Sequence, residues 1–416
     1  MLTRSGFSGL LHPFQACWIS LLSLIVLPFN QADGQAGATL DPNVIAADNY
    51  ASTHKPMEVL GRLLFWDPIL SGDRDTACAT CHHPDYAYAD GRALSRGTGA
   101  SGLGPARTDT SEGRIPLVRR NAPTVLNTAL NGMGSFSGQG GAQPGPGRMS
   151  TGPRAPMFWD HRVRSLALQA LEPIKAFEEM RGPSHTAEEI LDVVVSRLQE
   201  IPQYRYLFDE AFGAGSAITT IRLGEAIAAF EKTLIAMDSP YDRFLRGQTD
   251  ALTEQQQRGL NTFGNMRCDS CHGGTMFSDY ALHTEGVGEH PLVAEADAGA
   301  GSFNFRSPTL RNIALTAPYM HNGTLETLEE VLHFYNEGES RNPNVAKAGD
   351  GQNRANLARL DASFIDVPRM SDAEMADIIA FLESLTDPAF DKSIPASVPS
   401  GLPPGGSITS ASNGGQ

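Results

Sequence analysis

The sequence predicts a mainly α-helical protein built from two similar small domains that pack against each other. Apolar residues recur at helical spacing in several segments, whereas the alternation typical of strands is scarce. A Cys-x-x-Cys-His motif occurs once in each half of the chain, and each copy follows an apolar, helix-like stretch. The 416 residues are enough for two domains with cores of their own.

Each motif ends a helix-like segment. The first follows MEVLGRLLFWDPILSGDRDTA, residues 57–77, and the second follows TEQQQRGLNTFGNMR, residues 253–267. In the second segment Thr253 and Gln256 form a capping box, and Leu260 and Phe263 share a helical face.

Three further helices are expected. The segment 219–237 is apolar at helical spacing and is expected to bridge the two halves. The segment TLEEVLHFYNEG begins with a capping box of Thr327 and Glu330 and ends at Gly338. The last helix begins with a capping box of Ser371 and Glu374.

The N-terminus predicts a secretory signal peptide over residues 1–36. Arg4 precedes the apolar run WISLLSLIVLP, which is short for a membrane helix and is followed by small and polar residues. An uncleaved anchor is the alternative. We expect export to the periplasm, with a first domain over residues 41–215 and a second over 216–390. The Gly/Pro-rich stretch 131–156 predicts a flexible loop, and residues 391–416 predict a disordered tail.

The net charge of −15 argues against a nucleic-acid partner, because phosphate binding needs a basic surface. An acidic exported protein can attract basic partners, which include small electron-transfer proteins.

The cysteines indicate the cofactor. Cys17 lies in the expected signal peptide, and the other four cysteines form the two motifs, Cys78-Ala-Thr-Cys81-His82 and Cys268-Asp-Ser-Cys271-His272. Two disulfides, or one zinc site shared by both motifs, would leave the histidine after each pair unexplained. The Cys-x-x-Cys-His pattern is typical of c-type haem attachment, in which two thiols bind the porphyrin and the histidine ligates the iron. The sequence therefore predicts two covalently bound haem c groups, with His82 and His272 as iron ligands.

The second ligand of each iron decides its chemistry, since only an open position admits peroxide. No histidine occurs from Pro84 to Asp160, and Met133, Met149 and Met157 lie in or beside the Gly/Pro-rich stretch. We therefore expect the iron on His82 to be open. The candidates for the iron on His272 are Met276, Met320, His321, His333, Tyr335 and Met370. Taken alone, Tyr335 also fits a core aromatic residue, and Met370 is its rival as ligand.

Beyond the two motifs, the chain resembles the bacterial diheme cytochrome c peroxidase family over residues 57–387. The resemblance depends on segments in the family's order, namely LGRLLFWDPILSGDRDTACATCH, RNAPTVLN, FWDHR, QALEPIKAFEEM, CDSCH, PTLRNIALTAPYMHNGTLETLEEVLHFY and the last helix. It implies a peroxide-dependent oxidoreductase with two cytochrome c-like haem domains and a calcium ion between them. Peroxide would react at the first haem, and a small periplasmic cytochrome c or cupredoxin would deliver electrons through the second.

The resemblance also implies roles for single residues. Trp159 matches the tryptophan between the haems, and calcium oxygens would come from Asn121, Thr316 and Pro318, partly through backbone carbonyls. Without the resemblance, Trp159 would be interpreted as core packing.

Gln169, Pro173 and Glu179 match the residues above the peroxide-reactive iron. A carboxylate at Glu179 can take the proton from one peroxide oxygen and return it to the other. Glu178 is the alternative if the register shifts by one residue, and FEEM read alone would be a solvated charged turn.

Two departures from the family's pattern modify this expectation. The family usually has a histidine between the first motif and RNAP, and here that interval has none. Tyr335 occupies the position of the usual methionine ligand, a pattern of the methylamine-utilisation (MauG-like) branch, which oxidises side chains of a partner protein. The segment NMRCDSCH lacks that enzyme's tryptophan before the second motif. Peroxide reduction is therefore the leading expectation, with partner-protein oxidation or pure electron transfer as alternatives.

Overall fold

The computed structural model describes residues 50–132, 157–346 and 358–408. The expected signal peptide, the stretch 133–156 and residues 409–416 lie outside the described residues. The described residues belong to one compact unit.

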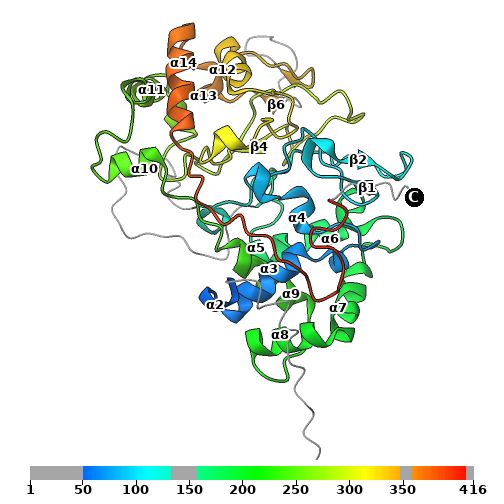
Figure 1. Ribbon diagram of the computed structural model, residues 1–416. Coiled ribbons are helices and arrows are strands. Elements are labelled where there is room, and N and C mark those ends of the chain that lie inside the picture. Colours follow the sequence, from blue (N-terminus) through cyan, green and yellow to red (C-terminus); the bar gives the residue numbers. More distant parts are fainter. Residues whose placement is uncertain (1–49, 133–156, 347–357, 409–416) are drawn as a thin grey trace, which may run out of the picture. The chain divides into compact units, whose positions relative to one another are not determined.

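Helices dominate the regular structure (Figure 1), which confirms the mainly α prediction. The α-helices are α2 (Tyr50–Thr53), α3 (Pro56–Trp66), α4 (Cys78–Cys81), α5 (Leu166–Gln169), α6 (Glu172–Lys175), α7 (Ile190–Glu200), α8 (Pro202–Phe212), α9 (Thr220–Glu231), α10 (Pro240–Leu245), α11 (Glu254–Asn265), α12 (Leu328–Glu337), α13 (Ala362–Ile365) and α14 (Asp372–Glu383). Short 3-10 turns are η1 (Pro68–Leu70), η2 (Pro84–Tyr86), η3 (Gly104–Ala106), η4 (Thr128–Leu130), η6 (Cys268–Ser270) and η7 (Ile313–Leu315), and η5 (Phe177–Arg181) is a π-helical turn.

Strands are confined to short ladders in the described ranges. β1 (Ala100–Ser101) pairs antiparallel with β2 (Thr108–Asp109), and β3 (Leu282–His283) pairs antiparallel with β4 (Phe305–Arg306). β5 (Val345–Ala346) pairs in parallel with β6 (Ala358–Arg359). No larger sheet occurs there, so helix packing builds the cores.

The helix before each motif packs in the same way. Gly61 of α3 lies so close to α9 that an added Cβ would come within 1.9 Å of the carbonyl oxygen of Ala226. Gly259 of α11 lies equally close to α14, because a Cβ added to it would come within 1.9 Å of the carbonyl oxygen of Asp377. Only a residue without a side chain allows this approach. The two halves therefore repeat one helix pair, in which α9 is the counterpart of α14.

This repeat assigns α9 to the first core. Its buried Leu223, Ile227 and Phe230 join the apolar cluster of α3, whereas the second cluster is centred on Phe263, Phe381 and neighbouring residues. The expected domain boundary at residue 216 places α9 in the second domain. In the structure α9 begins after this residue and packs into the first core instead. The helix also ends at Glu231, earlier than expected.

The helix caps follow the sequence at two of the three expected boxes. Complete capping boxes start α11 at Thr253 and α14 at Ser371. At α12, the Thr327 hydroxyl accepts a hydrogen bond from the Glu330 backbone, but the Glu330 carboxylate accepts from Glu326 instead of Thr327. The expected box at α12 is therefore only half formed.

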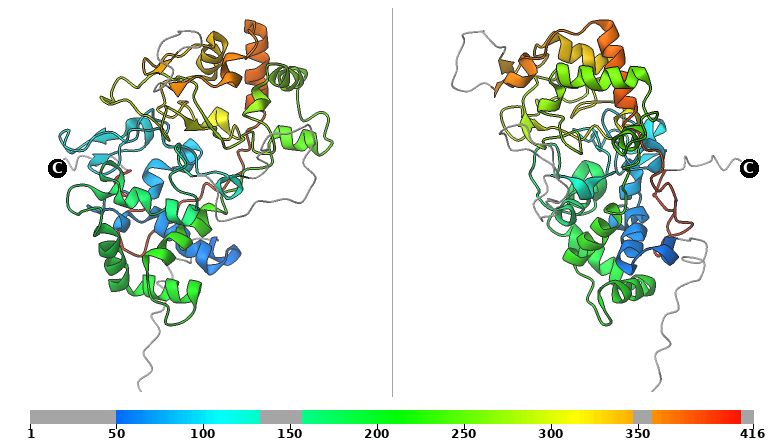
Figure 2. Two further views of the ribbon diagram at one scale, coloured as in Figure 1. Left: turned by 180° about the vertical axis from the view of Figure 1, so that it is seen from behind. Right: turned by 90° about the vertical axis from the view of Figure 1, so that its left-hand side faces the viewer.

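Residues 391–408 differ from the expected disordered tail. They run from α14 back to the first domain, as Figures 1 and 2 show. Val398 is buried in the first core, and the Ser400 hydroxyl donates a 2.6 Å hydrogen bond to the buried carboxylate of Asp67. The backbone of Gly405 bonds both Trp66 and the Thr80 hydroxyl inside the first motif. These polar anchors fix a segment whose composition alone predicts disorder.

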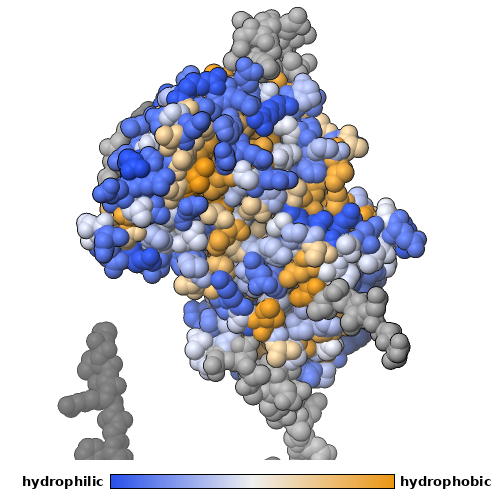
Figure 3. Space-filling view, turned by 45° about the horizontal axis from the view of Figure 1, so that its top comes forward, coloured by the Kyte–Doolittle hydropathy of each residue, from blue (hydrophilic) through white to orange (hydrophobic). Residues whose placement is uncertain are grey.

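Among the described helices, none has the length and apolarity needed to cross a membrane. The face drawn in Figure 3 is mostly hydrophilic, with several separate apolar patches.

Candidate functional site

Both motifs line one cavity of about 510 Å³. The four cysteines and the two histidines of the motifs are among its lining residues, and the cysteines are free thiols. Within the described ranges, the only cluster of metal-ligand type is Cys271, Asp279 and His283. The two cysteine pairs therefore form neither disulfides nor a shared zinc site.

The two motif histidines have the same geometry. Nδ1 of His82 lies 3.0 Å from the carbonyl oxygen of Tyr88, and Nδ1 of His272 lies 3.0 Å from that of Phe277. Burial lowers the pKa of both imidazoles, so each is neutral. A neutral imidazole that donates from Nδ1 has its lone pair on Nε2, which is the atom that ligates a metal. Thiols and oriented histidines thus fit two c-type haems.

Glu179 lies in the π-helical turn η5, and the turn is held by its backbone. The carbonyl oxygen of Glu179 accepts a 2.8 Å hydrogen bond from Thr98, and a Cβ on Gly97 would come within 2.0 Å of that oxygen. The side chain lines the cavity, and no described residue donates a hydrogen bond to its carboxylate. Burial, and next the nearby Glu178, raise the pKa of Glu179 to about 7. This group can therefore both accept and return a proton near neutral pH.

The other residues expected above the first iron line the same cavity. Gln169 is the last residue of α5, and Pro173 lies in the following helix α6. Glu178, the neighbour in the register alternative, is also a lining residue. The structure therefore brings all the expected residues to the cavity.

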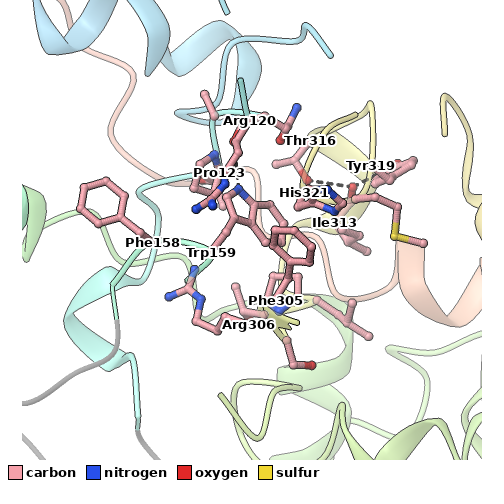
Figure 4. Close-up of a pocket in the computed structure, with 18 of the residues that line it drawn as sticks. Arg120, Pro123, Phe158, Trp159, Phe305, Arg306, Ile313, Thr316, Tyr319 and His321 are labelled. Carbon is pink, nitrogen blue, oxygen red and sulfur yellow. Dashed lines mark hydrogen bonds between the residues drawn. The ribbon is translucent and has the colours of Figure 1, made fainter. Parts of the chain in front are cut away.

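Trp159 joins the two halves beside the cavity (Figure 4). Its side chain is buried, and its indole Nε1–H donates a 3.0 Å hydrogen bond to the carbonyl oxygen of Asn121. Its own carbonyl oxygen accepts a 2.7 Å hydrogen bond from the Arg306 backbone. Asn121 belongs to the segment after the first motif and Arg306 to the segment after the second, so the tryptophan is fixed from both sides.

The residues expected to bind calcium also meet at this cavity. Asn121, Thr316 and Pro318 are all lining residues. The Asn121 Nδ2–H donates to the carbonyl oxygen of Arg92, and no described residue donates a hydrogen bond to the Asn121 Oδ1 atom. The carbonyl oxygens of Thr316 and Pro318 likewise accept no hydrogen bond from the described residues. Oxygen atoms of this kind are the ligands that Ca²⁺ prefers.

The candidates for the second iron separate by position. Tyr335 lines the cavity, and its hydroxyl donates a 3.0 Å hydrogen bond to Glu285. Met370, Met320 and His321 also line it. Met276 is completely buried and is not a lining residue, and the His333 side chain is half exposed. Tyr335 and its rival Met370 therefore both stay candidates, whereas Met276 and His333 do not.

Each remaining histidine of the cavity already has partners. The His283 ring is held between Asp279 and Asp361 at 2.8 Å each. The His321 ring stacks on Phe305 with centroids 3.6 Å apart. Of the methionines beside the loop, Met157 accepts a hydrogen bond from Asn131, and Met133 and Met149 lie outside the described residues. Among the described histidines that line the cavity, His283 is therefore held by two carboxylates and His321 by ring stacking, and His161, whose buried Nε2 atom has no hydrogen-bond partner, is not a lining residue.

Two features were not anticipated from the sequence. Arg120 binds both oxygens of Asp297 at 2.6 and 2.8 Å, and it also binds Asp160 at 2.8 Å. The carboxyl of Glu231 is buried at the cavity without a partner for Oε2. The first is an ion pair between residues far apart in sequence, which no local pattern signals. Glu231 directly follows an apolar helical run, and a glutamate in that position is ordinarily expected to face solvent.

Comparison with known proteins gives one consistent result. The family model described as di-haem cytochrome c peroxidase matches residues 55–250. Methylamine utilization protein MauG of Methylorubrum extorquens is 33% identical over 338 residues, covering 78% of this chain and 77% of that protein. Cytochrome c551 peroxidase of Pseudomonas aeruginosa is 31% identical over 331 residues, covering 75% and 82%.

Solved structures agree with these relatives. The crystal structure of a MauG-like protein associated with microbial copper homeostasis superposes with a TM-score of 0.59 at 27% identity, covering 81% of this chain and 92% of that chain. The two cytochrome c-like domains of the diheme peroxidase fold are therefore confirmed, and the two motifs attach two c-type haems. The chain belongs to the di-haem cytochrome c peroxidase family of peroxide-dependent oxidoreductases.

Proposed function

We propose that this protein is a periplasmic diheme peroxidase that reduces hydrogen peroxide at the first haem, with electrons delivered through the second. One observation carries the proposal. The unpartnered carboxylate of Glu179 lines the cavity together with His82, while His283 is held between two carboxylates and His321 is stacked on Phe305. This arrangement supports an iron that is open to peroxide and has an acid–base group beside it.

The chain's own residues supply the proton chemistry. A haem held by His82 with an open position would supply the peroxide-binding site and the electrons for cleavage of the O–O bond. The Glu179 carboxylate takes the proton from the inner peroxide oxygen and returns it to the outer oxygen, which leaves as water. The overall reaction consumes two electrons and two further protons and yields two waters. Gln169 offers amide donors that orient the peroxide, and Pro173 adds apolar surface that limits water.

Trp159 would relay electrons that enter through the second haem. The indole is buried, rigidly held and in contact with both halves. These properties suit a relay, because a fixed aromatic ring between two redox centres shortens each electron step. Asn121, Thr316 and Pro318 would hold Ca²⁺ next to this route.

Tyr335 and His272 would together hold the second iron. Its hydroxyl lies in the cavity, and burial together with Glu285 keeps its pKa well above the ordinary value in the absence of metal. A ferric ion can displace that proton, as bound metals do with other acidic ligands. A tyrosinate favours ferric iron, so the second haem would have a low potential.

The first test is the EPR spectrum of the oxidised protein, with a haem count on the same sample. We expect one high-spin and one low-spin signal in equal amounts, together with turnover of peroxide by a reduced small cytochrome or cupredoxin. Two low-spin signals would contradict the open first site and would favour pure electron transfer.

Oxidation of a partner protein is the second candidate function. It is favoured by Tyr335 in the cavity and by the similarity to proteins named for methylamine utilisation. Incubation with peroxide and candidate partner proteins, followed by mass spectrometry of the partners, tests it. Modified partner side chains without oxidation of any small carrier would favour this function over peroxide removal.

A further inference from the structure

Glu231 is a buried acid that the proposed mechanism does not use. It is the last residue of α9, its side chain is only 4% exposed, and it lines the cavity that holds the haem motifs. Its Oε2 atom has neither solvent contact nor a hydrogen-bond partner. An unpartnered buried carboxyl is costly, so the cavity is where its partner must come from.

A second orphan group lies in a neighbouring segment. The Thr128 hydroxyl is also buried, unpartnered and part of the cavity lining. Asn127, the residue before it, exchanges hydrogen bonds with Leu234 and Ala236 just after α9. Two polar groups on joined segments thus line a cavity that would hold a haem.

Several effects raise the pKa of Glu231. Burial raises the pKa of its carboxyl to about 8, and the C-terminal end of a helix also disfavours a negative charge. The exposed Lys232 opposes this only in part, and Cys78 of the first motif, which attaches the haem, is close enough to interact with the carboxyl. The charged residues of the helices packed on α9 are Glu58 and Arg62 of α3 and Asp192, Arg197 and Glu200 of α7, and α5 has none.

We propose that Glu231 is the redox-linked proton site of the first haem. Its carboxylate takes up one proton from solvent when that haem takes up one electron, and it releases the proton on reoxidation. The electron adds a negative charge to the haem, and in a medium of low dielectric this charge strengthens proton binding at Glu231. The electron and the proton together leave the net charge of the buried site unchanged. This inference rests on the attached haems, and it goes beyond the proposed peroxide chemistry at Glu179.

The test is an anaerobic spectroelectrochemical titration of the holoprotein at a series of pH values around 8. We expect the midpoint potential of the first haem to fall by ~59 mV per pH unit in this range. The reason is that one proton accompanies one electron, and a tenfold change in proton activity corresponds to ~59 mV for a one-electron couple. Glu231→Gln should abolish this slope and give the higher potential at alkaline pH. Glu225→Gln, an exposed glutamate on the same helix, should keep the slope.

The same titration distinguishes Glu231 from the other buried carboxyl groups with a raised pKa. Glu179 has a pKa near 7, and the buried Asp90 near 6, so Glu179→Gln should keep the slope around pH 8. A slope that persists in Glu231→Gln, or is absent from the wild type, would overturn the proposal. The titration uses no peroxide, so a protein without peroxidase activity can still give either result.

A measurement on the wild-type protein tests the proposal even if the Glu231→Gln variant does not fold or does not bind haem. Redox-induced infrared difference spectra should show the carbonyl band of a protonated carboxyl group growing on reduction at pH 8. If no such band appears, the proposal fails without reference to any variant.

Discussion

The indole of Trp159 donates its Nε1–H to the carbonyl oxygen of Asn121 at 3.0 Å, and the Asn121 N–H in turn donates to the carbonyl oxygen of His321 at 2.8 Å. One short chain of hydrogen bonds therefore links the tryptophan to segments that follow the first and the second motif. Arg306 closes the arrangement by donating its backbone N–H to Trp159. The ring has little freedom to move, which is what a fixed electron relay requires.

Replacing Trp159 by Phe should slow electron transfer between the haems while leaving the reaction of the first haem with peroxide unchanged. Phenylalanine keeps most of the packing but is harder to oxidise and leaves the Asn121 carbonyl without its donor. Stopped-flow absorbance after mixing the half-reduced protein with peroxide separates the two steps.

Trp66→Phe is the matched control for Trp159. Trp66 is completely buried in the first core, its Nε1 has no partner, and it does not line the cavity. Its replacement should lower stability only. Equal slowing in both variants would mean that Trp159 acts through packing.

Glu179→Gln should lower the second-order rate of the oxidised protein with peroxide by about 10²–10⁴-fold, the usual effect of removing a general acid–base group. The amide fills the same space but cannot accept the peroxide proton. Glu178→Gln is the control, because this neighbour also lines the cavity. If Glu178→Gln loses the activity and Glu179→Gln keeps it, the register of the proposed site is off by one residue.

The pH profile of that rate follows from the pKa of Glu179, which burial raises to about 7. Below this value the carboxyl is protonated and cannot act as base, so the rate should fall about tenfold per pH unit at acidic pH. Above it the carboxylate is ionised and the rate should level off. Rates measured from pH 5 to 9 on the wild type and Glu179→Gln check this. A rate that rises towards acidic pH would contradict the base role.

The sequence predicted much of the fold because its signals are local. The helix at 254–265, for example, has its capping box and its apolar face within one segment. The haem motifs are equally local, since thiols and histidine lie within one turn. The repeat of Gly61 and Gly259 was not predicted, because each glycine is explained only by a partner helix far away in the chain.

The sequence predicted the individual residues of the site but not the contacts between residues that lie far apart in the chain. The ion pairs of Arg120 with Asp297 and Asp160 join residues that are 177 and 40 positions apart in the sequence. Glu231 lies inside the helix expected over residues 219–237, and no local signal marks it, because only tertiary packing removes its solvent. The segment 391–408 has the composition of a disordered chain, yet Asp67 and Trp66 offer it fixed hydrogen bonds.

This ordered C-terminal segment gives a stability prediction. Ser400→Ala removes the hydroxyl that donates to Asp67, a carboxylate that is buried and also bound by Tyr204. We expect a loss of about 1–3 kcal/mol in the free energy of unfolding, the cost of an incompletely satisfied buried group. Urea denaturation of the holoprotein measures it. Ser397→Ala, a half-buried position without a hydrogen bond, should be near neutral, and equal stability of both variants would mean that the segment is not held through Asp67.

The ligand of the second iron can be decided between Tyr335 and Met370, which both line the cavity. If Tyr335 is the ligand, Tyr335→Met should shift the low-spin EPR signal and raise the midpoint potential of that haem. The reason is that methionine stabilises ferrous iron, whereas a hard anionic oxygen stabilises ferric iron. Met370→Leu should leave both the signal and the potential unchanged, because Met370 would then only pack.

Tyr319→Phe serves as the control for a general effect of removing a cavity tyrosine. Its hydroxyl donates to the carbonyl oxygen of Ile313, and the ring lines the same cavity. This variant should keep the low-spin signal. Conversion of the second haem to high spin by Met370→Leu, with Tyr335→Met silent, would identify methionine as the ligand. The second haem would then have a high potential, which favours plain peroxide reduction over oxidation of a partner protein.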